Sequence, residues 1–365
     1  MKPEADAIVY CQGAFNTANG KTAHGLVRFT RRYRIRAVVD RRFTGRDAGE
    51  VLDGIRSGIP IHGSIQESLR HLGKPKPSHL VVGLAPDGGR LRPEEREEIA
   101  AALDMGLHID SGLHDFLSED PALAGKARER GLRLRDIRKP PPRDQLHFFS
   151  GKINQVTSVK LALLGTDSAV GKRTTAWLLV DALNRGGRST EMVGTGQTAW
   201  MQGARFGIIL DSLVNDFVSG EIEHAVWSAW REAKPSVIVI EGQGSLLNPA
   251  YPGGFEILAA GRPDMIVLQH APARHDYDGF PGYPIHPLDR QIAALAAITD
   301  SPVAAVTLNH EGIPAADIPA ACDAVRRATG LPAFDVLSGG AEGLAQALLP
   351  RIDTLLEERN HGVSG

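Results

Sequence analysis

The 365-residue sequence has few cysteines, no long apolar run and almost no net charge. Its two cysteines, Cys11 and Cys322, are too few for a disulfide framework, which favours a reducing compartment. No apolar stretch approaches the roughly 20 residues of a membrane-spanning helix. The N-terminal MKPEADAIVYCQGAF carries acids and no long apolar run, unlike a signal peptide. Because 41 basic residues nearly balance 43 acidic ones, we expect no general affinity for nucleic acid or membranes. The cysteine count and the N-terminus together lead us to expect a cytoplasmic protein.

The sequence does contain a regular alternation of apolar strands and amphipathic helices, which is typical of parallel α/β sheets. In the first half this pattern predicts strands at 7–11, 35–40, 79–85 and 107–110 and helices at 64–72 and 93–106. The prolines of IRKPPPRDQ, residues 137–145, cannot continue a helix or a central strand. We therefore place a domain boundary there and expect domains over 1–145 and 146–365.

The alternation starts again in the second half. It predicts strands at 160–165, 189–196, 235–245, 264–271 and 303–310 and helices at 173–186 and 217–233. Ligands of open, mostly parallel α/β sheets bind beyond the carboxyl ends of the strands. The loops that follow these strands are therefore the places to look for a site.

The clearest motif is LALLGTDSAVGKRTTAWLLV, residues 161–180, where a predicted strand ends at Gly165 and a helix begins near Arg173. Gly165 and Gly171 let the loop fold tightly and bring backbone N–H groups toward a ligand. The helix N-terminus adds partial positive charge, and Lys172 adds a full charge. Strand, glycines, lysine and helix occur in the order that a phosphate-binding loop requires. We expect the following residues to bind phosphates: Gly165, Thr166, Asp167, Ser168, Ala169, Val170, Gly171, Lys172, Arg173, Thr174 and Thr175.

The loop departs from the usual G-x-x-x-x-G-K-[ST] pattern at one important position. Arg173 stands where Ser or Thr normally ligates the Mg²⁺ of a bound nucleotide. The next hydroxyl, on Thr174, is turned by about 100° around the helix. An inward-directed Arg173 would repel a metal ion and attract a further phosphate. The motif therefore predicts phosphate binding without predicting Mg²⁺-ATP turnover.

Polar residues also follow other predicted strands. Glu241 comes directly after the buried strand VIVI, where it can serve as a general base or as an acid near a metal. The run GQGS, which includes Gln243, offers backbone N–H groups. The segment GTGQTAWMQG, 194–203, is predicted to be a ligand-binding loop with Gln197 and an exposed Trp200.

The segment 270–291 places several histidines and aspartates between turn residues. These are metal-ligand types, but no spacing matches a zinc signature, so a substrate loop is favoured over a metal site. Arg274 or Arg290 would there pair with a carboxylate of the substrate. The candidate substrate-binding residues are Gln197, Gln243, His270, Arg274 and Arg290.

Three further features are not interpreted as functional sites. Eight arginines between residues 28 and 46 are taken as a solvated rim. Asp40 stands at a strand end like the ribose-binding acid of dinucleotide folds, but the turn QGAFNTANG lacks G-x-G-x-x-G. Cys11 and Cys322 lie in apolar surroundings and are taken as buried small hydrophobes.

The blocks GTDSAVGKRTT, GTGQTAW, EGQGSLLNP and PGYPIHPLD resemble a P-loop family long filed as a domain of unknown function, whose members are described as D-glutamate N-acetyltransferases. The resemblance covers nearly the whole chain. It implies an N-terminal Rossmann-like domain followed by a P-loop NTPase-like parallel α/β domain. It also implies acetyl-CoA as cosubstrate, with its phosphates on the loop, and no metal. The loop is similar to that of dethiobiotin synthetase as well, which reads G-T-D-T-x-V-G-K-T and uses Mg²⁺-ATP.

An amino acid that attacks a thioester needs a general base. Glu241 and Asp167 are the candidates, and His270 and His286 are weaker ones. Without a nucleophilic cysteine, direct transfer is favoured over an acetyl-enzyme. Two alternatives stay open, a Mg²⁺-ATP-dependent ligase or kinase of the dethiobiotin synthetase type and a non-catalytic nucleotide sensor. We also expect a homo-oligomer, as is common for α/β enzymes of this size.

Overall fold

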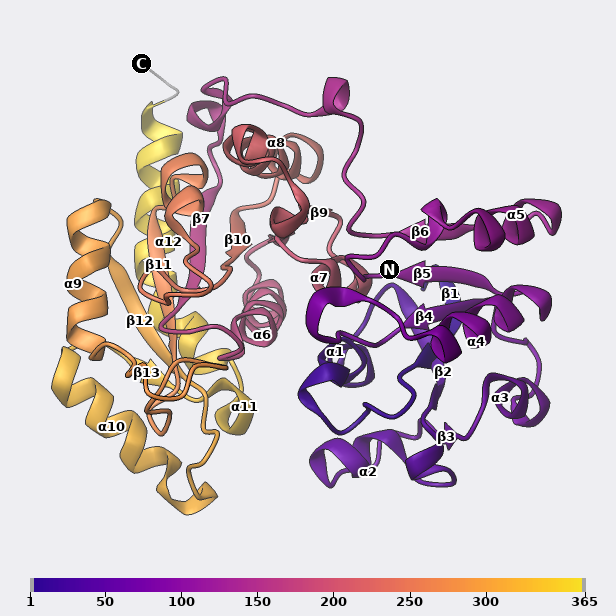
Figure 1. Cartoon of the computed structure of the whole chain (residues 1–365). Coiled ribbons are helices and arrows are strands. Elements are labelled where there is room, and N and C mark those ends of the chain that lie inside the picture. Colours follow the sequence, from indigo (N-terminus) through magenta and orange to yellow (C-terminus); the bar gives the residue numbers. More distant parts are fainter. Residues whose placement is uncertain (1–2, 363–365) are drawn as a thin grey trace. The chain divides into compact units, whose positions relative to one another are not determined.

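The computed structural model describes residues 3–362, which fall into two compact units (Figure 1). The first unit extends to Pro141 and also includes Gln197–Ala204. The second comprises Pro142–Gly196 and the chain from Arg205 onward. Each unit has its own sheet and its own hydrophobic core. Within residues 3–362 no helix is long and apolar enough to cross a membrane.

The first unit contains a six-stranded parallel sheet in the order β3-β2-β1-β4-β5-β6. Its strands are β1 (Ala5–Tyr10), β2 (Tyr33–Val39), β3 (Ile61–His62), β4 (His79–Val82), β5 (His108–Ser111) and β6 (Leu134–Asp136). Its helices are α1 (Lys21–Arg28), α2 (Ala48–Asp53), α3 (Ile65–His71), α4 (Pro93–Asp104) and α5 (Pro121–Glu129). The strand order reverses between β1 and β4, as it does in Rossmann-like folds. The predicted Rossmann-like domain is confirmed.

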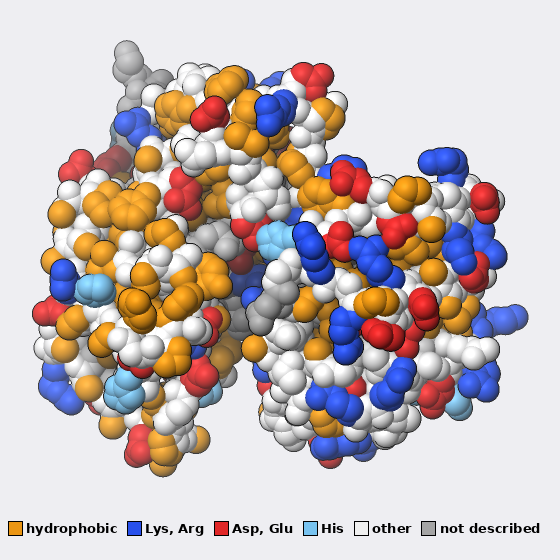
Figure 2. All heavy atoms as spheres, in the orientation of Figure 1, with side chains coloured by type: hydrophobic (Ala, Val, Ile, Leu, Met, Phe, Trp, Pro, Cys, Tyr) orange, Lys and Arg blue, Asp and Glu red, His pale blue; other side chains and the backbone are white. Residues whose placement is uncertain are grey.

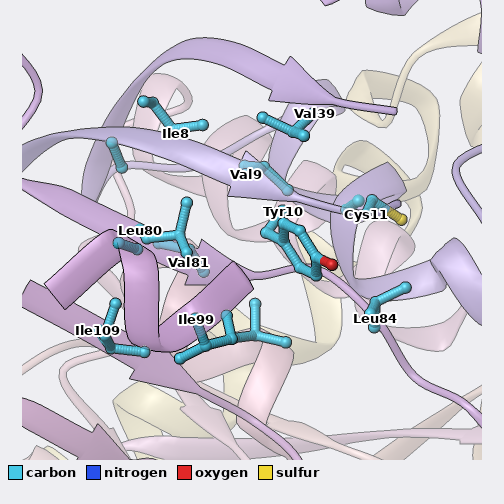
Figure 3. Packing of buried hydrophobic residues seen from close by; sticks show 14 of the residues in the cluster. Ile8, Val9, Tyr10, Cys11, Val39, Leu80, Val81, Leu84, Ile99 and Ile109 are labelled. Atoms are coloured by element: carbon cyan, nitrogen blue, oxygen red, sulfur yellow. The ribbon is translucent and has the colours of Figure 1, made fainter. Parts of the chain in front are cut away.

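The strands of this sheet are apolar because both of their faces are covered. Ile8 and Val9 point to opposite faces as neighbours in β1, yet both are fully buried. Figure 3 shows the ring of Tyr10 among aliphatic side chains that include Leu84 and Ile99. This packing explains why the N-terminal strands could be predicted from short, continuous apolar runs.

The second unit contains a seven-stranded parallel sheet in the order β13-β12-β11-β7-β10-β8-β9. Its strands are β7 (Val159–Gly165), β8 (Thr190–Gly194), β9 (Phe206–Gly207), β10 (Val237–Glu241), β11 (Met265–His270), β12 (Val303–Leu308) and β13 (Ala333–Phe334). Its helices are α6 (Lys172–Arg185), α8 (Asn215–Ala233), α9 (Leu288–Ile298), α10 (Ile318–Thr329), α11 (Val336–Gly339) and α12 (Glu342–Gly362). β7 pairs with β11 on one side and with β10 on the other. The loop after β7 is therefore flanked by the carboxyl ends of both neighbours.

The segment expected to be a ligand-binding loop, 194–203, is instead largely helical. Helix α7 (Gln197–Gln202) packs in the first unit, so the exposure predicted for Trp200 is wrong. The Trp200 ring is half-buried, with the guanidinium carbons of Arg32 and Arg135 at 3.7 and 4.3 Å from its centre. Gln202 donates a 2.9 Å hydrogen bond to the Gly25 carbonyl. These contacts attach α7 to the first sheet and its helices.

The arginines between residues 28 and 46 mostly pair with carboxylates of the first unit. The ion pairs are Arg28–Asp53, Arg32–Glu4, Arg34–Asp6, Arg36–Asp6, Arg41–Glu98 and Arg42–Asp40. Figure 2 accordingly shows basic and acidic side chains interspersed over this unit. Asp40 is fully buried and also accepts a 3.0 Å hydrogen bond from the Phe15 backbone. Its carboxylate is thus occupied by the chain itself.

Candidate functional site

The loop between β7 and α6 has a backbone suited to binding an anion. Gly171 has a φ of 101°, a region that favours glycine, and it caps α6 directly before Lys172. A Cβ at Gly165 would lie 3.0 Å from the Lys172 ammonium nitrogen. Glycine at this position therefore leaves room for the lysine to fold back over the loop.

Lys172 lies over the loop and is held by backbone carbonyls. Its Nζ donates to the carbonyl oxygens of Asp167, at 2.8 Å, and Gly244, at 2.7 Å. Burial lowers the pKa of Lys172 to about 8, although Asp167 and Glu241 favour its charge. An ammonium group has three N–H donors. Two are used by the carbonyls, which leaves one for an anion.

Arg173, the residue that departs from the usual motif, lies near Glu241. Burial lowers the pKa of Arg173, and the charge of Glu241 opposes this effect. Its Nε is enclosed and has no hydrogen-bond partner within the part of the chain that the structure describes. An enclosed donor without a partner costs roughly 1–3 kcal/mol. A ligand that accepts this hydrogen bond would recover that cost.

The threonines after Arg173 differ in their surroundings. Thr174 is half-buried, whereas Thr175 is buried with its hydroxyl 2.6 Å from Gln269 Oε1. Gln269, the penultimate residue of β11, also accepts from the Thr307 hydroxyl at 2.7 Å. The Thr175 hydroxyl is thus engaged inside the domain. Its predicted contact with a cofactor stays a prediction.

Glu241 ends β10 and lies within the core of the second unit. Only 3% of the residue is exposed, and Oε2 accepts a 2.9 Å hydrogen bond from the Thr195 backbone N–H. Burial raises the pKa of Glu241, against the opposing effects of Arg173 and the Thr195 N–H. The Thr195 hydroxyl donates to the Glu241 carbonyl and accepts from Gln243 Nε2, at 3.0 and 2.9 Å. A fixed carboxyl with a raised pKa is suited to proton transfer near neutral pH.

Asp167, the other candidate base, is fully buried and accepts four hydrogen bonds. Oδ1 accepts from the Ser168 N–H at 2.7 Å and Asn248 Nδ2 at 2.8 Å. Oδ2 accepts from Arg274 Nη1 and the Asp278 N–H, both at 2.9 Å. These four hydrogen bonds leave few lone pairs of the carboxylate for a substrate proton. The geometry favours Glu241 over Asp167 as the base.

Arg274 links the loop after β7 to Glu311 through its hydrogen bonds. Its guanidinium donates to Asp167, to the Ser168 carbonyl and to Glu311 at 2.8–2.9 Å. Burial opposes its charge, but the hydrogen bonds to Glu311 and Asp167 outweigh burial and raise the pKa of Arg274. A substrate carboxylate would therefore have to compete with two carboxylates of the chain.

The other substrate candidates occupy different places. His270 Nδ1 lies 3.0 Å from the Thr166 hydroxyl, and burial lowers the pKa of His270 to about 4. Arg290 is exposed on α9, and Gln243 is half-exposed in the loop after β10. Gln197 belongs to α7 of the first unit. The structure brings Gln243, His270 and Arg274 to the loops around β7 in the second unit, and their contacts with a substrate stay predictions.

The segment 270–291 is organised by its own hydrogen bonds. The Tyr277 hydroxyl lies 2.9 Å from His286 Nδ1, and Asp276 accepts from the Gly282 N–H at 2.8 Å. Ser168 of the loop donates to Asp278 at 2.9 Å. Among residues 3–362 no cluster of three or more His, Cys, Asp or Glu side chains is arranged to hold a metal ion.

Comparison with known proteins places the chain in a family. Residues 147–345 match the family described as a domain of unknown function, DUF1611_C, P-loop domain, and residues 41–140 match the Rossmann-like DUF1611_N. The chain belongs to the DUF1611 family. A crystal structure of a DUF1611 family protein from Anabaena variabilis is similar, with a TM-score of 0.87 and 29% identity over 95% of this chain and 99% of that one. The predicted order of a Rossmann-like domain and a P-loop domain is confirmed.

Two relatives of this DUF1611 chain carry a functional name. A protein named D-glutamate N-acetyltransferase from Tritonibacter scottomollicae is 30% identical over 282 residues, which cover 74% of this chain and 80% of the relative. A protein of the same name from a Pseudoalteromonas species is 29% identical over 277 residues, with the same shares. The family resemblance inferred from the sequence blocks is thereby confirmed.

Sequence reasoning missed several polar residues of the DUF1611 site. Thr195, Asn248, Gln269 and Thr307 are buried, and their side chains bond to Glu241, Asp167 or each other. A polar residue inside an apolar strand, such as Gln269 in MIVLQH, is the signal that could have identified one of them. Thr307 in VAAVTL carries the same signal, whereas Thr195 and Asn248 lie in loops, where their sequence gives no such contrast.

Proposed function

We propose that this DUF1611 protein is an N-acetyltransferase that moves the acetyl group of acetyl-CoA to the amino group of an amino acid, with D-glutamate as the expected acceptor. The observation that carries the proposal is a phosphate-binding loop with Arg173 in place of the metal-binding hydroxyl, next to a buried Glu241 whose pKa is raised. The names of the two relatives support this class of reaction.

The loop suits coenzyme A because that cosubstrate is bound through phosphates that remain intact. The free donor of Lys172, the unpartnered Nε of Arg173 and loop N–H groups other than those of Thr166 and Ser168, which already bond to Gln269 and Asp167, can serve phosphate oxygens. No phosphoryl group is transferred, so the reaction needs no metal ion to neutralise a leaving phosphate. Arg173 thus fits coenzyme A better than Mg²⁺-ATP.

In the proposed reaction the neutral amine attacks the thioester carbonyl carbon. A C–N bond forms while the C=O electron pair moves onto oxygen. When the carbonyl is restored, the C–S bond breaks and coenzyme A leaves with the electron pair on sulfur. Glu241 takes the proton that nitrogen loses and returns a proton to sulfur. The products are the N-acetyl amino acid and coenzyme A with a free thiol.

Direct transfer is favoured over a covalent acetyl-enzyme because the cysteines are unsuitable nucleophiles. Burial raises the pKa of both the Cys11 and the Cys322 thiol. A thiol of raised pKa is a poor nucleophile, since the thiolate is the reactive form. The attacking amine would therefore meet acetyl-CoA in a ternary complex.

The test is to mix the purified protein with acetyl-CoA and either enantiomer of glutamate, in the presence of EDTA, and to follow the release of free thiol. The proposal predicts release with D-glutamate. Absence of release with every amino acid, together with binding of Mg²⁺-ATP, would contradict it and support a ligase or kinase.

A further inference from the structure

Three aromatic rings of the second unit form a row beside the phosphate-binding loop. Tyr251 lies in the loop after β10, and Phe280 and Tyr283 lie in the segment after β11. The ring centres of Tyr251 and Phe280 are 6.3 Å apart and those of Phe280 and Tyr283 are 6.4 Å apart, both edge to face. Tyr251 is 56% exposed and Tyr283 is 58% exposed. Because β10 and β11 flank β7, this aromatic row joins the two loops that border the phosphate-binding loop.

The backbone that carries the row is bonded to the phosphate-binding loop from both sides. Asn248 Oδ1 accepts from the Tyr251 N–H, and Asn248 Nδ2 donates to Asp167, both at 2.8 Å. From the other side, Asp278, two residues before Phe280, donates its N–H to the same carboxylate at 2.9 Å. Each of the two rings that meet is therefore attached to Asp167 through a residue of its own loop.

The Tyr251 end of the row lies close to groups that are assigned to the proposed reaction. A Cβ at Gly244 would lie 2.0 Å from the Tyr251 carbonyl oxygen, so the two backbones touch. The Gly244 carbonyl accepts the hydrogen bond from Lys172. Glu241, the proposed base, precedes Gly244 by three residues at the end of β10. The row thus begins next to the cation that we expect to bind a phosphate.

The two loop tips that carry the row contain no charged residue. They read PAYPGGF over 249–255 and GFPGYPI over 279–285. Phosphates and the carboxylates of glutamate are bound by cations and N–H donors, and proline has no backbone N–H. Exposed aromatic rings instead offer contact area to uncharged groups. The composition of the tips therefore favours a neutral part of a ligand over a charged one.

We propose that the aromatic row binds the uncharged arm of coenzyme A, the chain of amide and methyl-bearing groups that joins its phosphates to its thioester; this inference rests on the proposed acetyl-CoA chemistry. The phosphates stay on the loop with Lys172, and the arm packs against the rings that start at Tyr251. Rings on fixed loops hold the arm in one place and so present the thioester to the attacking amine. The contact is made by the rings and does not require the tyrosine hydroxyls.

The test is calorimetric binding of two ligands to Tyr251→Ala and to the wild type. One ligand is coenzyme A, and the other is adenosine 3′-phosphate 5′-diphosphate, which is coenzyme A without its arm. We expect Tyr251→Ala to weaken the binding of coenzyme A about tenfold, as for the loss of one aromatic contact. Its affinity for the ligand without the arm should equal that of the wild type. Equal weakening of both ligands, or unchanged affinity for coenzyme A, overturns the proposal.

Two further variants separate the ring from other effects of the substitution. Tyr251→Phe keeps the ring and should bind both ligands as the wild type does. Phe148→Ala is the matched control, since Phe148 is 65% exposed in the same unit but contacts Phe217 of α8; it should change neither affinity. A wild-type protein that binds coenzyme A but releases no thiol from acetyl-CoA would instead contradict the proposed function, so the two failures are distinguishable.

Discussion

At the scale of single residues, the two buried carboxylates of the site, Glu241 and Asp167, differ in how many hydrogen bonds they accept. Asp167 accepts hydrogen bonds from four donors. Glu241 has the backbone N–H groups of Thr195 and Gly196 and the nearby charges of Arg173 and Lys172, and the effect of burial on its pKa dominates. The lone pairs of Asp167 are therefore largely occupied by the chain, whereas those of Glu241 are less so.

We expect Glu241→Gln to lower kcat by roughly 10²–10⁴-fold, because glutamine cannot take up the proton of the amine. Affinity for coenzyme A should not change, which calorimetry can check alongside the thiol assay. Glu221→Gln is a control, since Glu221 pairs with His147 outside the loop. In the wild type, the raised pKa of Glu241 should place the acid limb of the kcat profile above pH 4.5. Full turnover in Glu241→Gln would exclude it as the base.

His270 makes the stability of the fold depend on pH. Burial lowers its pKa from 6.5 to about 4. Between pH 6.5 and pH 4 the His270 imidazole is protonated in the unfolded chain and neutral in the folded chain. The free energy of unfolding therefore falls as the pH drops from 6.5 toward 4. The loss at pH 4 is roughly 3 kcal/mol. Urea unfolding at pH 7 and pH 4.5 should show a smaller loss for His270→Gln, and equal losses would contradict this assignment.

At the scale of elements, Asp167 connects three loops of the second unit. Through Asn248 it binds the loop after β10, and through Arg274 and Asp278 it binds the segment after β11. These loops come from strands on both sides of β7. The phosphate-binding loop is thus held in place from both neighbouring strands.

Removal of this anion should destabilise the second unit. We expect Asp167→Ala to lower the free energy of unfolding by about 3–5 kcal/mol, because it leaves the partly buried Arg274 without one of its partners. Chemical denaturation measures the effect, with Asp289→Ala as a control at an exposed carboxylate near the start of α9. A free energy of unfolding as high as that of the wild type would show that Asp167 is not a structural anchor.

The elements that could be predicted are those whose own sequence carries the signal. The strand before the phosphate-binding loop and α6 after it follow from an apolar run, two glycines and a lysine. The two-residue strands β3, β9 and β13 are too short to show a period. Helix α7 was missed because its stabilising partners, such as Gly25 and Arg32, lie far away in the sequence.

The candidate site was predictable to a similar degree. Lys172, Arg173 and Glu241 were identified because they follow glycines or a strand. The four hydrogen bonds of Asp167 were not, since Asn248 and Arg274 are 81 and 107 residues away along the chain. Local sequence therefore indicates the candidate site, and the fold decides which of its carboxylates is occupied by the chain itself.

At the scale of the whole molecule, two separate segments of the chain form the first unit. Helix α7 belongs to the first unit although it lies between β8 and β9 of the second. Its residues Ala199 and Met201 are fully buried there. The second unit is therefore continuous in space but interrupted in sequence.

We expect a truncated protein of residues 142–365 to aggregate, because α7 would lose the partners that cover its apolar face. Size-exclusion chromatography and the soluble yield measure this outcome. Replacement of residues 197–204 by a glycine- and serine-rich linker in the same truncated protein should restore solubility. A monomeric, soluble truncation without the replacement would show that α7 does not depend on the first unit.

The position of α7 has an evolutionary consequence. Two domains joined only end to end can be exchanged by a single recombination between them. Here such an event would separate α7 from the helices and arginines that surround it. A new partner domain would need to supply an equivalent docking surface for six residues of its neighbour. Because α7 lies within the sequence of the P-loop domain and packs in the Rossmann-like domain, we expect the two domains to be inherited together.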